Sequence, residues 1–234
     1  MKRISITLFA AVMFIAATLK ASAQETQNRQ VSGFNAIASS GSFNVHVKID
    51  GKESLKITGE KSALDEIETV VEDGTLKLRF KKDHNWTENH YGKIEVEISA
   101  KSLSSLSLSG SGKFDVDGSL TGEVKLAISG SGNISTGVKA EKIHASISGS
   151  GNVTVNGSAN EGSFAISGSG NLKAGELKVG SVSVSIAGSG SVHVNAEKSI
   201  SGHIAGSGNL YYTGNAQVTD FRSAGSGSIR KGSE

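Results

Sequence analysis

The chain has 234 residues, with 24 Lys and Arg against 22 Asp and Glu, and it contains no Cys and no Pro. It can therefore form no disulfide and carry no lipid-modified Cys, so burial and backbone hydrogen bonds have to hold its fold. Removing a signal peptide with Lys2, Arg3 and Lys20 leaves 21 basic and 22 acidic residues. This near-neutral charge gives no reason to expect binding to nucleic acid or to an anionic membrane surface.

Residues 1–23 have the features of a cleaved signal peptide. A short basic start precedes the apolar run ISITLFAAVMFIAATL, and the segment Ala21–Ala23 fits the small-x-small rule for cleavage before Gln24. The alternative is a membrane anchor, but about 16 apolar residues are fewer than the roughly 20 that a helix needs to cross a bilayer. We therefore expect an exported protein whose mature chain does not span a membrane.

Residues 24–102 are predicted to form a β-rich cap with the first turns of a coil. The segments FNVHVKID, SLKITG, TLKLRFKK and KIEVEISA alternate apolar and polar residues, as half-buried strands do. KSALDEIETVV favours a short helix with Ser62 as its N-cap. The stretch IASSGSFNV indicates a degenerate copy of the repeat that follows, with Ser39 in place of a marker glycine. Because the raw end of a coil invites other strands to pair, we expect the cap to cover one end of a single domain, residues 24–234.

The segment Asp83–Gly92 differs chemically from the rest of the chain. It holds the only Trp, two of the six His and one of the three Tyr. Trp86, with His84, His90 and Tyr91, makes it a candidate loop for contact with a sugar or a partner protein. The alternative is that Trp86 folds back over the core of the cap, and the sequence leaves both open.

Residues 103–234 repeat the motif Gly-Ser-Gly at a period of 18 to 20 residues. The first glycine of each copy, taken as a marker, is found at Gly110, Gly130, Gly149, Gly168, Gly188, Gly206 and Gly225. Such a period is typical of solenoids, whereas a flexible linker has no pattern around its glycines. Apolar residues recur two and four positions before the marker and four and six after it. This alternation with period two predicts strands on both sides of a corner.

The repeat predicts an all-β fold, a single-stranded right-handed β-helix or β-solenoid with 18 to 20 residues per turn. The strands of one turn should pair in parallel with those of the next, about 4.8 Å away, and point their apolar columns inward. The first and third residues of Gly-Ser-Gly are expected to supply a corner with positive φ. The next residue is Asn in four copies, and Asn tolerates left-handed backbone and can form amide ladders along a stack.

The glycine motif predicts neither a phosphate site nor a calcium site. A phosphate loop needs a helix directly behind its glycines, and a predicted strand follows these. Calcium-binding nonapeptide repeats need Asp beside their glycines, and these copies carry Asn or Ser. The sequence therefore predicts no metal and no cofactor.

A β-helix enzyme would need carboxylates gathered on one face. Six acidic residues fall at six different offsets from the preceding marker, so we expect no carboxylate column and no catalytic residues. They are Glu123, Glu141, Glu161, Glu176, Glu197 and Asp220. Asp115 and Asp117 should point outward together, which favours an ordinary exposed acidic strand over a site. His144, His193 and His203 lie in outward columns without aligned partners, so they predict no metal site.

The outward columns before the marker are rich in small residues. Three positions before it are found Ser107, Ala127, Ser146, Ala165 and Ser185. A face this small and uncharged is flat. It could stack on a second copy or an extended ligand, and the alternative is a solvated Ser-rich sheet.

The sequence as a whole resembles the head GIN domain family of auto-transporter adhesins from Bacteroidetes-type bacteria. The resemblance covers nearly the whole mature chain and rests on GFNAIASSGSFNVHV, VVEDGTLKLRF, IEVEISAKSLSSLSLSGSG and the repeated ISGSGN. It implies an exported β-helical protein and brings no catalytic residues with it.

These observations favour an exported, non-catalytic adhesin-like binding or scaffold protein of the cell envelope. Its expected location is the periplasm, the outer cell surface or the extracellular space, and its expected partner is a glycan or a cell-surface protein. One alternative is a carbohydrate-active enzyme of the β-helix type, a polysaccharide lyase or hydrolase. The other is a purely structural envelope component that self-associates through the Ser/Ala face.

Overall fold

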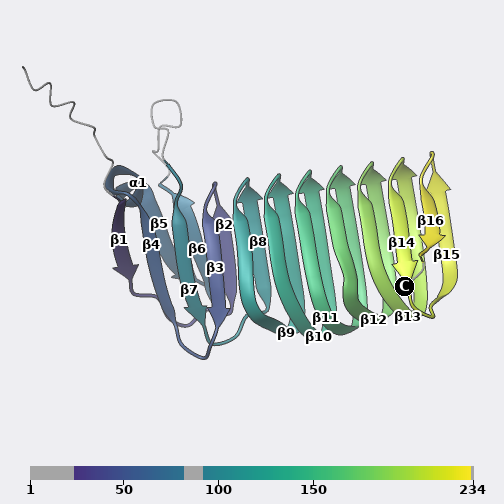
Figure 1. Cartoon of the computed structure of the whole chain (residues 1–234), viewed down its shortest axis with the longest axis horizontal. Coiled ribbons are helices and arrows are strands. Elements are labelled where there is room, and N and C mark those ends of the chain that lie inside the picture. The colour runs from purple at the N-terminus through teal and green to yellow at the C-terminus, as the bar shows by residue number, and fades with distance from the viewer. Residues whose placement is uncertain (1–23, 82–91, 233–234) are drawn as a thin grey trace, which may run out of the picture.

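The computed structural model of the chain describes residues 24–81 and 92–232, which form one stack of β-coils with a cap at the N-terminal end (Figure 1). The predicted signal peptide lies outside the described residues. The elements of the cap are β1 (Gln24–Arg29), β4 (Ser54–Glu60), α1 (Lys61–Glu66), β5 (Ile67–Glu72), β6 (Thr75–Phe80) and β7 (Glu95–Ala100). The coils consist of β2 (Ala36–Ser40), β3 (Asn44–Ile49), β8 (Ser105–Gly110), β9 (Lys113–Gly130), β10 (Asn133–Gly149), β11 (Asn152–Gly168), β12 (Asn171–Gly188), β13 (Ser191–Gly206), β14 (Asn209–Thr213), β15 (Gln217–Ala224) and β16 (Ser228–Lys231).

Each turn of the coil contributes to two sheets. The first sheet has the order β1-β4-β7-β3-β9-β10-β11-β12-β13-β14-β16. The second sheet runs from β5, β6, β2 and β8 through the last parts of β9 to β13, and ends at β15. The long strands bend, because β3 pairs with the start of β9 whereas β8 pairs with its end. The pairs between coils are parallel, and β1–β4, β4–β7 and β5–β6 are antiparallel. The predicted β-solenoid with a β-rich cap is therefore confirmed.

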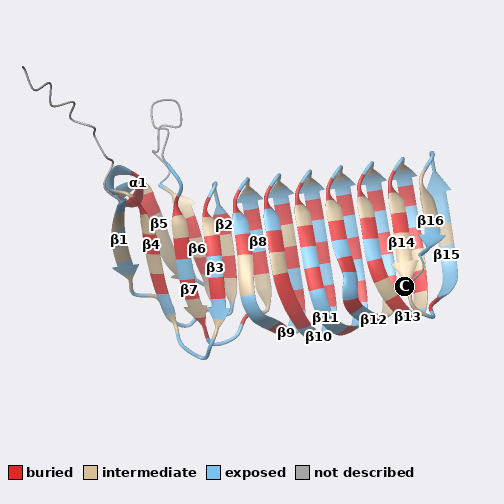
Figure 2. Cartoon of the chain, viewed as in Figure 1, coloured by how far each residue is buried: buried red, intermediate tan, exposed pale blue. Residues whose placement is uncertain are grey.

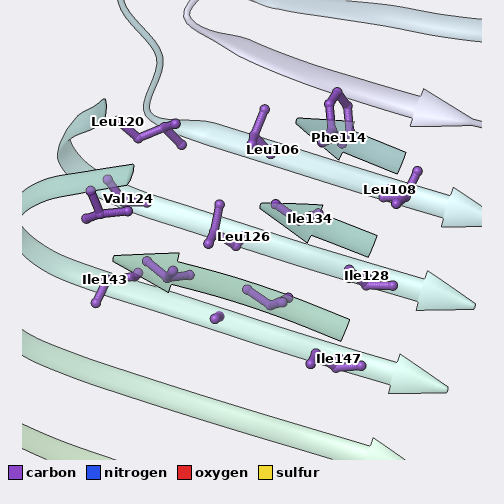
Figure 3. Close-up of a cluster of buried hydrophobic side chains, with 14 of the residues drawn as sticks. Leu106, Leu108, Phe114, Leu120, Val124, Leu126, Ile128, Ile134, Ile143 and Ile147 are labelled. Atoms are coloured by element: carbon purple, nitrogen blue, oxygen red, sulfur yellow. The ribbon is translucent and has the colours of Figure 1, made fainter. Parts of the chain in front are cut away.

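The core lies between the two sheets as stacks of like side chains (Figure 3). Leu108, Ile128 and Ile147 are neighbours in register on the second sheet, and Phe114 and Ile134 are neighbours on the first. Buried and exposed residues alternate along the strands (Figure 2), as the period of two predicts. Each fully buried aliphatic side chain contributes about 1.5–3 kcal/mol, so the repeated columns supply the main stabilising term.

The corner of each repeat depends on both glycines of Gly-Ser-Gly, for different reasons. The marker glycine has positive φ, +125° at Gly130, as expected. The third residue does not have positive φ, so that expectation is wrong. A Cβ on Gly132 would lie 2.6 Å from the carbonyl oxygen of Gly112 in the preceding turn. The second glycine is thus required by the close approach of stacked turns.

The Asn residues after the corner form a ladder along the stack. Asn152 Nδ2 donates to Asn133 Oδ1 at 3.0 Å, and Asn171 Nδ2 donates to Asn152 Oδ1 at 3.1 Å. None of these Asn residues has positive φ, so left-handed backbone is not the reason for Asn. The predicted amide ladder is confirmed.

The first coil in the sequence is a true copy of the repeat, but its predicted register was wrong by two residues. Ser39 is opposite Leu108, and Gly41 lies against Gly110 with φ +142°. The marker position therefore belongs to Gly41, and Ser39 occupies an inward apolar column. A shift of two residues leaves the same side chains facing inward, so alternation alone could not reveal the error.

The order of strands in space departs from their order in the sequence at this end. Strand β2 lies between β6 and β8, and β3 lies between β7 and β9. After β3 the chain runs outward to build the cap and then returns past the first coil. This excursion places the strands of the cap beside residues that come much later in the chain.

The predicted helix is shorter than its pattern, and Ser62 is not its N-cap. Strand β4 stays paired with β1 up to Glu60, which becomes the N-cap without a capping side-chain hydrogen bond. The helix buries Ala63 and Leu64, and the β-branched run that follows forms β5 instead of continuing the helix.

Candidate ligand-binding groove

The outward side chains of the first sheet form rows across the strands, because neighbouring strands are in register. One of them, which we call the central row, crosses the whole molecule. In spatial order it consists of Asn28, Lys56, Glu97, His46, Asp115, Ser135, Thr154, Lys173, His193, Tyr211 and Arg230. Its charged residues therefore lie at the two ends, with Ser and Thr between them.

A groove of about 1320 Å³ lies over the cap end of the central row, and we call it the junction groove. Its lining comes from the end of β1 and the following linker, from β4, β7 and β3, and from the first part of β9. Figure 1 shows these strands at the N-terminal end of the stack. The polar side chains that it gathers include Asn28, His46, Lys48, Lys56, Glu97, Asp115 and Asp117. Residues separated by most of the cap sequence thus share one surface.

His46 lies between two carboxylates at the groove. Its Nε2 is 3.4 Å from Glu95 Oε2, and its Nδ1 is 3.9 Å from Asp115 Oδ2. The His46 side chain is 53% exposed, so water screens both pairs and each contributes at most about 1 kcal/mol. The cluster is hydrated and can offer both donors and acceptors to a ligand.

Glu95 is held in its ionised form. Lys93 Nζ is 2.5 Å from Glu95 Oε1, and Asn44 Nδ2 donates to the same oxygen at 3.2 Å. The hydrogen bond from Lys93 is the largest cause that lowers the pKa of Glu95, and Asn44 and His46 lower it further against desolvation. A carboxylate of this kind accepts hydrogen bonds and is unsuited to donate a proton as a general acid.

Glu53 fixes one wall of the groove. Its Oε1 accepts the N–H of Gly33 at 2.7 Å and the N–H of Phe34 at 3.3 Å, and Lys101 Nζ donates to its Oε2 at 2.6 Å. The Lys101 hydrogen bond is the largest of the causes that lower the pKa of Glu53. These contacts tie the linker after β1 to the β3–β4 connection, so the wall is held by three charge-assisted hydrogen bonds.

A smaller depression of about 280 Å³ lies over β10 to β13 on the second sheet. Lys142 Nζ is 3.1 Å from Glu161 Oε2, and this hydrogen bond is the main cause that raises the pKa of Lys142. Five Ser residues and His144 complete much of the lining, and Ser181 and Ser199 share a hydrogen bond of 3.0 Å. The depression is much smaller than the junction groove, and Lys142 within it is already paired with Glu161.

The expectation that no acidic residues share a column is wrong at this depression. Lys142 is opposite Glu123 on one side and Glu161 on the other. Both Glu residues lie seven positions before the following marker glycine. Between the preceding marker glycine and these Glu residues the chain passes through a bend whose length differs from coil to coil. Offsets from the preceding marker therefore do not match positions in register. Lys142 forms an ion pair with Glu161, whereas Glu123 lies near Lys125 and His144.

The structure describes some of the candidate residues from the sequence and not others. Asp115 and Asp117 do lie on one outward strand face, and in addition they line the junction groove. His144, His193 and His203 are exposed as expected. The contact residues Trp86, His84, His90 and Tyr91 lie outside the described residues, so their role stays a prediction.

The sequence did not reveal the groove because most of the residues that line it precede Gly110, the first marker glycine. His46, Glu95 and Glu97 meet Asp115 only through the spatial order β7-β3-β9. Within residues 24–81 and 92–232, no group of three or more His, Asp or Glu residues is arranged to hold a metal ion. Nor does this part of the chain contain a helix long and apolar enough to cross a membrane.

Comparison with solved structures supports the fold. A structure described as a putative adhesin from Bacteroides fragilis is 26% identical, with 90% of this chain and 98% of that chain covered and a TM-score of 0.83. One described as a putative lipid binding protein from Parabacteroides distasonis is 26% identical, with coverage of 90% and 97% and a TM-score of 0.70. A putative adhesin from the same species is 25% identical, with coverage of 90% and 98% and a TM-score of 0.71. No curated protein matches the chain.

The chain also matches a protein-family model. The matching model spans residues 33–216, from the linker before β2 to the turn before β15, and so includes the first coil and nearly all of the repeats. The chain belongs to the family described as putative auto-transporter adhesin, head GIN domain.

Proposed function

We propose that this protein is an exported, non-catalytic binding protein of the cell envelope whose ligand occupies the junction groove. The observation that supports this most directly is the groove itself, because it gathers charged side chains from β4, β7, β3 and β9 on one surface. The adhesin descriptions of the family and of two structural relatives agree with a binding role. The predicted signal peptide accounts for export.

The chemistry of the groove favours a polar ligand, a glycan or the polar surface of a cell-surface protein. Lys56 Nζ is 2.8 Å from Glu97 Oε2, and both side chains remain partly exposed. Paired donors and acceptors of this kind suit sugar hydroxyl groups, which donate and accept in turn. One structural relative is described as a lipid binding protein. An acyl chain needs a continuous apolar wall, whereas in this groove Val31 and Val116 lie among charged side chains such as Lys48.

The charge state of the carboxylates supports binding over hydrolysis. A glycosidase needs one carboxyl group with a raised pKa to protonate the leaving group. Lys101 lowers the pKa of Glu53, which lines the groove, and Lys93 lowers the pKa of Glu95, which lies beside it. The neighbouring surface is therefore suited to hold a ligand through ionised carboxylates.

A glycan array with the purified protein, followed by calorimetric titration of the glycans that bind, tests this proposal. Glu97→Gln with Asp115→Asn should weaken binding by about tenfold or more, since two charge-assisted contacts are lost. Glu197→Gln with Asp220→Asn removes two exposed carboxylates from the repeats and serves as the matched control, expected to bind like the unchanged protein.

Equal affinities for the groove variant and its control would place the ligand elsewhere. Turnover of any polysaccharide that a single carboxylate substitution abolishes would overturn the non-catalytic role and favour the enzyme alternative.

A further inference from the structure

The far end of the central row carries a second surface with a different chemistry. Lys173, His193, Tyr211 and Arg230 are opposite one another on β12, β13, β14 and β16. Lys173, His193 and Arg230 are exposed, and Tyr211 is half-buried. With strands about 4.8 Å apart, the four side chains extend over about 14 Å along the axis of the stack. We call this set the cationic ladder.

The two rings of the ladder are ordered against each other. The ring centroids of His193 and Tyr211 are 4.6 Å apart, and the ring planes differ by 18°. Stacked rings of this kind have few rotamers left to lose when a ligand binds. Their polar atoms, an imidazole N–H and a phenol O–H, lie between the cations of Lys173 and Arg230. All four side chains can therefore donate hydrogen bonds at nearly regular intervals.

No carboxylate opposes these donors in the rows that surround them. From Ser135 to Arg230 the central row of the described strands contains no acidic residue. The neighbouring row of Asn171, Ser191, Asn209 and Ser228 is likewise uncharged. At the cap end, in contrast, the central row has a carboxylate on each side of His46, Glu97 and Asp115. Glu176 and Glu197 belong to the same coils as the ladder but lie outside both rows.

We propose that the cationic ladder binds a linear acidic glycan, with its carboxylate or sulfate groups on Lys173 and Arg230 and its chain along the axis of the stack. The row of Asn and Ser beside the ladder supplies partners for the hydroxyl groups of the sugars. Ser228 Oγ already donates to Asn209 Oδ1 at 2.9 Å, so this row is pre-ordered. A nucleic acid fits less well, because the mature chain is nearly neutral and the ladder has only two permanent cations.

The ladder is distinct from the junction groove, and its test can be separated from that of the proposed function. The probe is polygalacturonate, with neutral dextran and double-stranded DNA as comparison ligands, titrated against the purified protein. Polygalacturonate should bind, dextran should not, and added salt should weaken binding because the charges are exposed. The groove variant Glu97→Gln with Asp115→Asn should leave this binding unchanged.

Matched variants then assign the binding to the ladder. Lys173→Gln with Arg230→Gln should lower the affinity by about tenfold or more, whereas Lys139→Gln with Lys198→Gln, two exposed Lys outside the row, should change it by less than about twofold. Tyr211→Phe keeps the stack and removes only one donor, so about a threefold loss is expected. Equal losses in the ladder and control variants, equal binding of dextran, or tighter binding of DNA would each overturn the proposal, as would a protein that does not bind polygalacturonate.

Discussion

The cap and the repeated coils share the same two sheets, but they close them in different ways. In the repeats, backbone hydrogen bonds connect neighbouring turns at the corners. Ser131 N–H and Gly132 N–H both donate to the carbonyl of Gly110 in the turn before, and the pattern recurs from turn to turn. In the cap, side-chain hydrogen bonds also connect neighbouring segments. The guanidinium of Arg29 donates to the carbonyl oxygens of Leu64 and Ile67 at 2.7 and 2.6 Å.

This difference explains where chemical variety can arise. A corner built from backbone contacts in every turn requires small residues and leaves little choice of side chain. A cap held by single charged side chains has no such repeat and can gather unlike groups on one surface. The junction groove lies at the cap for this reason, and the repeats mainly set the shape and length of the molecule.

The largest expected effect comes from breaking a corner of the repeats. Gly168→Ala places a Cβ 2.5 Å from the carbonyl oxygen of Gly149, at a φ of +123° that Ala rarely adopts. We expect the free energy of unfolding to fall by about 3 kcal/mol or more. Denaturant-induced unfolding followed by circular dichroism measures this loss.

Gly175→Ala is the matched control within the same coil. Gly175 has no heavy atom within 4 Å of the added Cβ, and its φ is not positive, so a change of less than about 1 kcal/mol is expected. If Gly168→Ala were as mild as Gly175→Ala, the stacked backbone contacts would not be what holds the repeats together.

An opposite change in stability is expected in the first coil. Ser39 is 1% exposed between Leu78 and Leu108 of the neighbouring strands, and its Oγ has no hydrogen-bond partner among the described residues. Ser39→Ala removes an unpaired buried hydroxyl and should raise the free energy of unfolding by about 1 kcal/mol.

Thr136 provides the counterpart in the repeats. It is also buried, but its Oγ1 donates to the carbonyl of Gly137 at 3.0 Å. Thr136→Val should therefore lower the free energy of unfolding by about 1 kcal/mol. The same sign for both substitutions in thermal or denaturant unfolding would contradict the distinction between a paired and an unpaired hydroxyl.

The contrast between the regions also explains what could be predicted from the sequence. Because the repeat occurs seven times, apolar residues recur at the same positions of most copies, and the inward position of residues such as Ile128 and Phe114 could be predicted. The first coil is a single, degenerate copy of the repeat, and its predicted register was wrong by two residues. The groove required knowing that β3 lies between β7 and β9, and nothing in the local pattern of residues 44–100 encodes that order.

The shared column of acidic residues in the repeats was missed because the bends between the two sheets differ in length. Glu123 and Glu161 seemed unrelated when counted through a bend, although the strand after the bend puts both opposite Lys142. Counting toward the nearer marker glycine would have found this column. Ser62 was misplaced for another reason, because the pairing of β4 with β1 extends the strand to Glu60.

The smallest expected effect is a difference between the cap and the repeats in how the free energy of unfolding changes at acid pH. The pKa of Glu95 is lowered in the folded protein, first by Lys93. The ionised Glu95 therefore stabilises the fold above its unfolded pKa, and this contribution is lost as the pH falls through the lower, folded pKa. Glu95→Gln should cost less than about 1 kcal/mol at neutral pH and should make stability decline less steeply on the acid side. Glu197→Gln, which removes an exposed carboxylate of the repeats, should leave that slope unchanged, and urea unfolding across a pH series compares the two. Identical slopes for both variants would mean that the Lys93 contact does not persist in solution, and the charged side chains of the cap would then contribute no more to stability than those on the repeats.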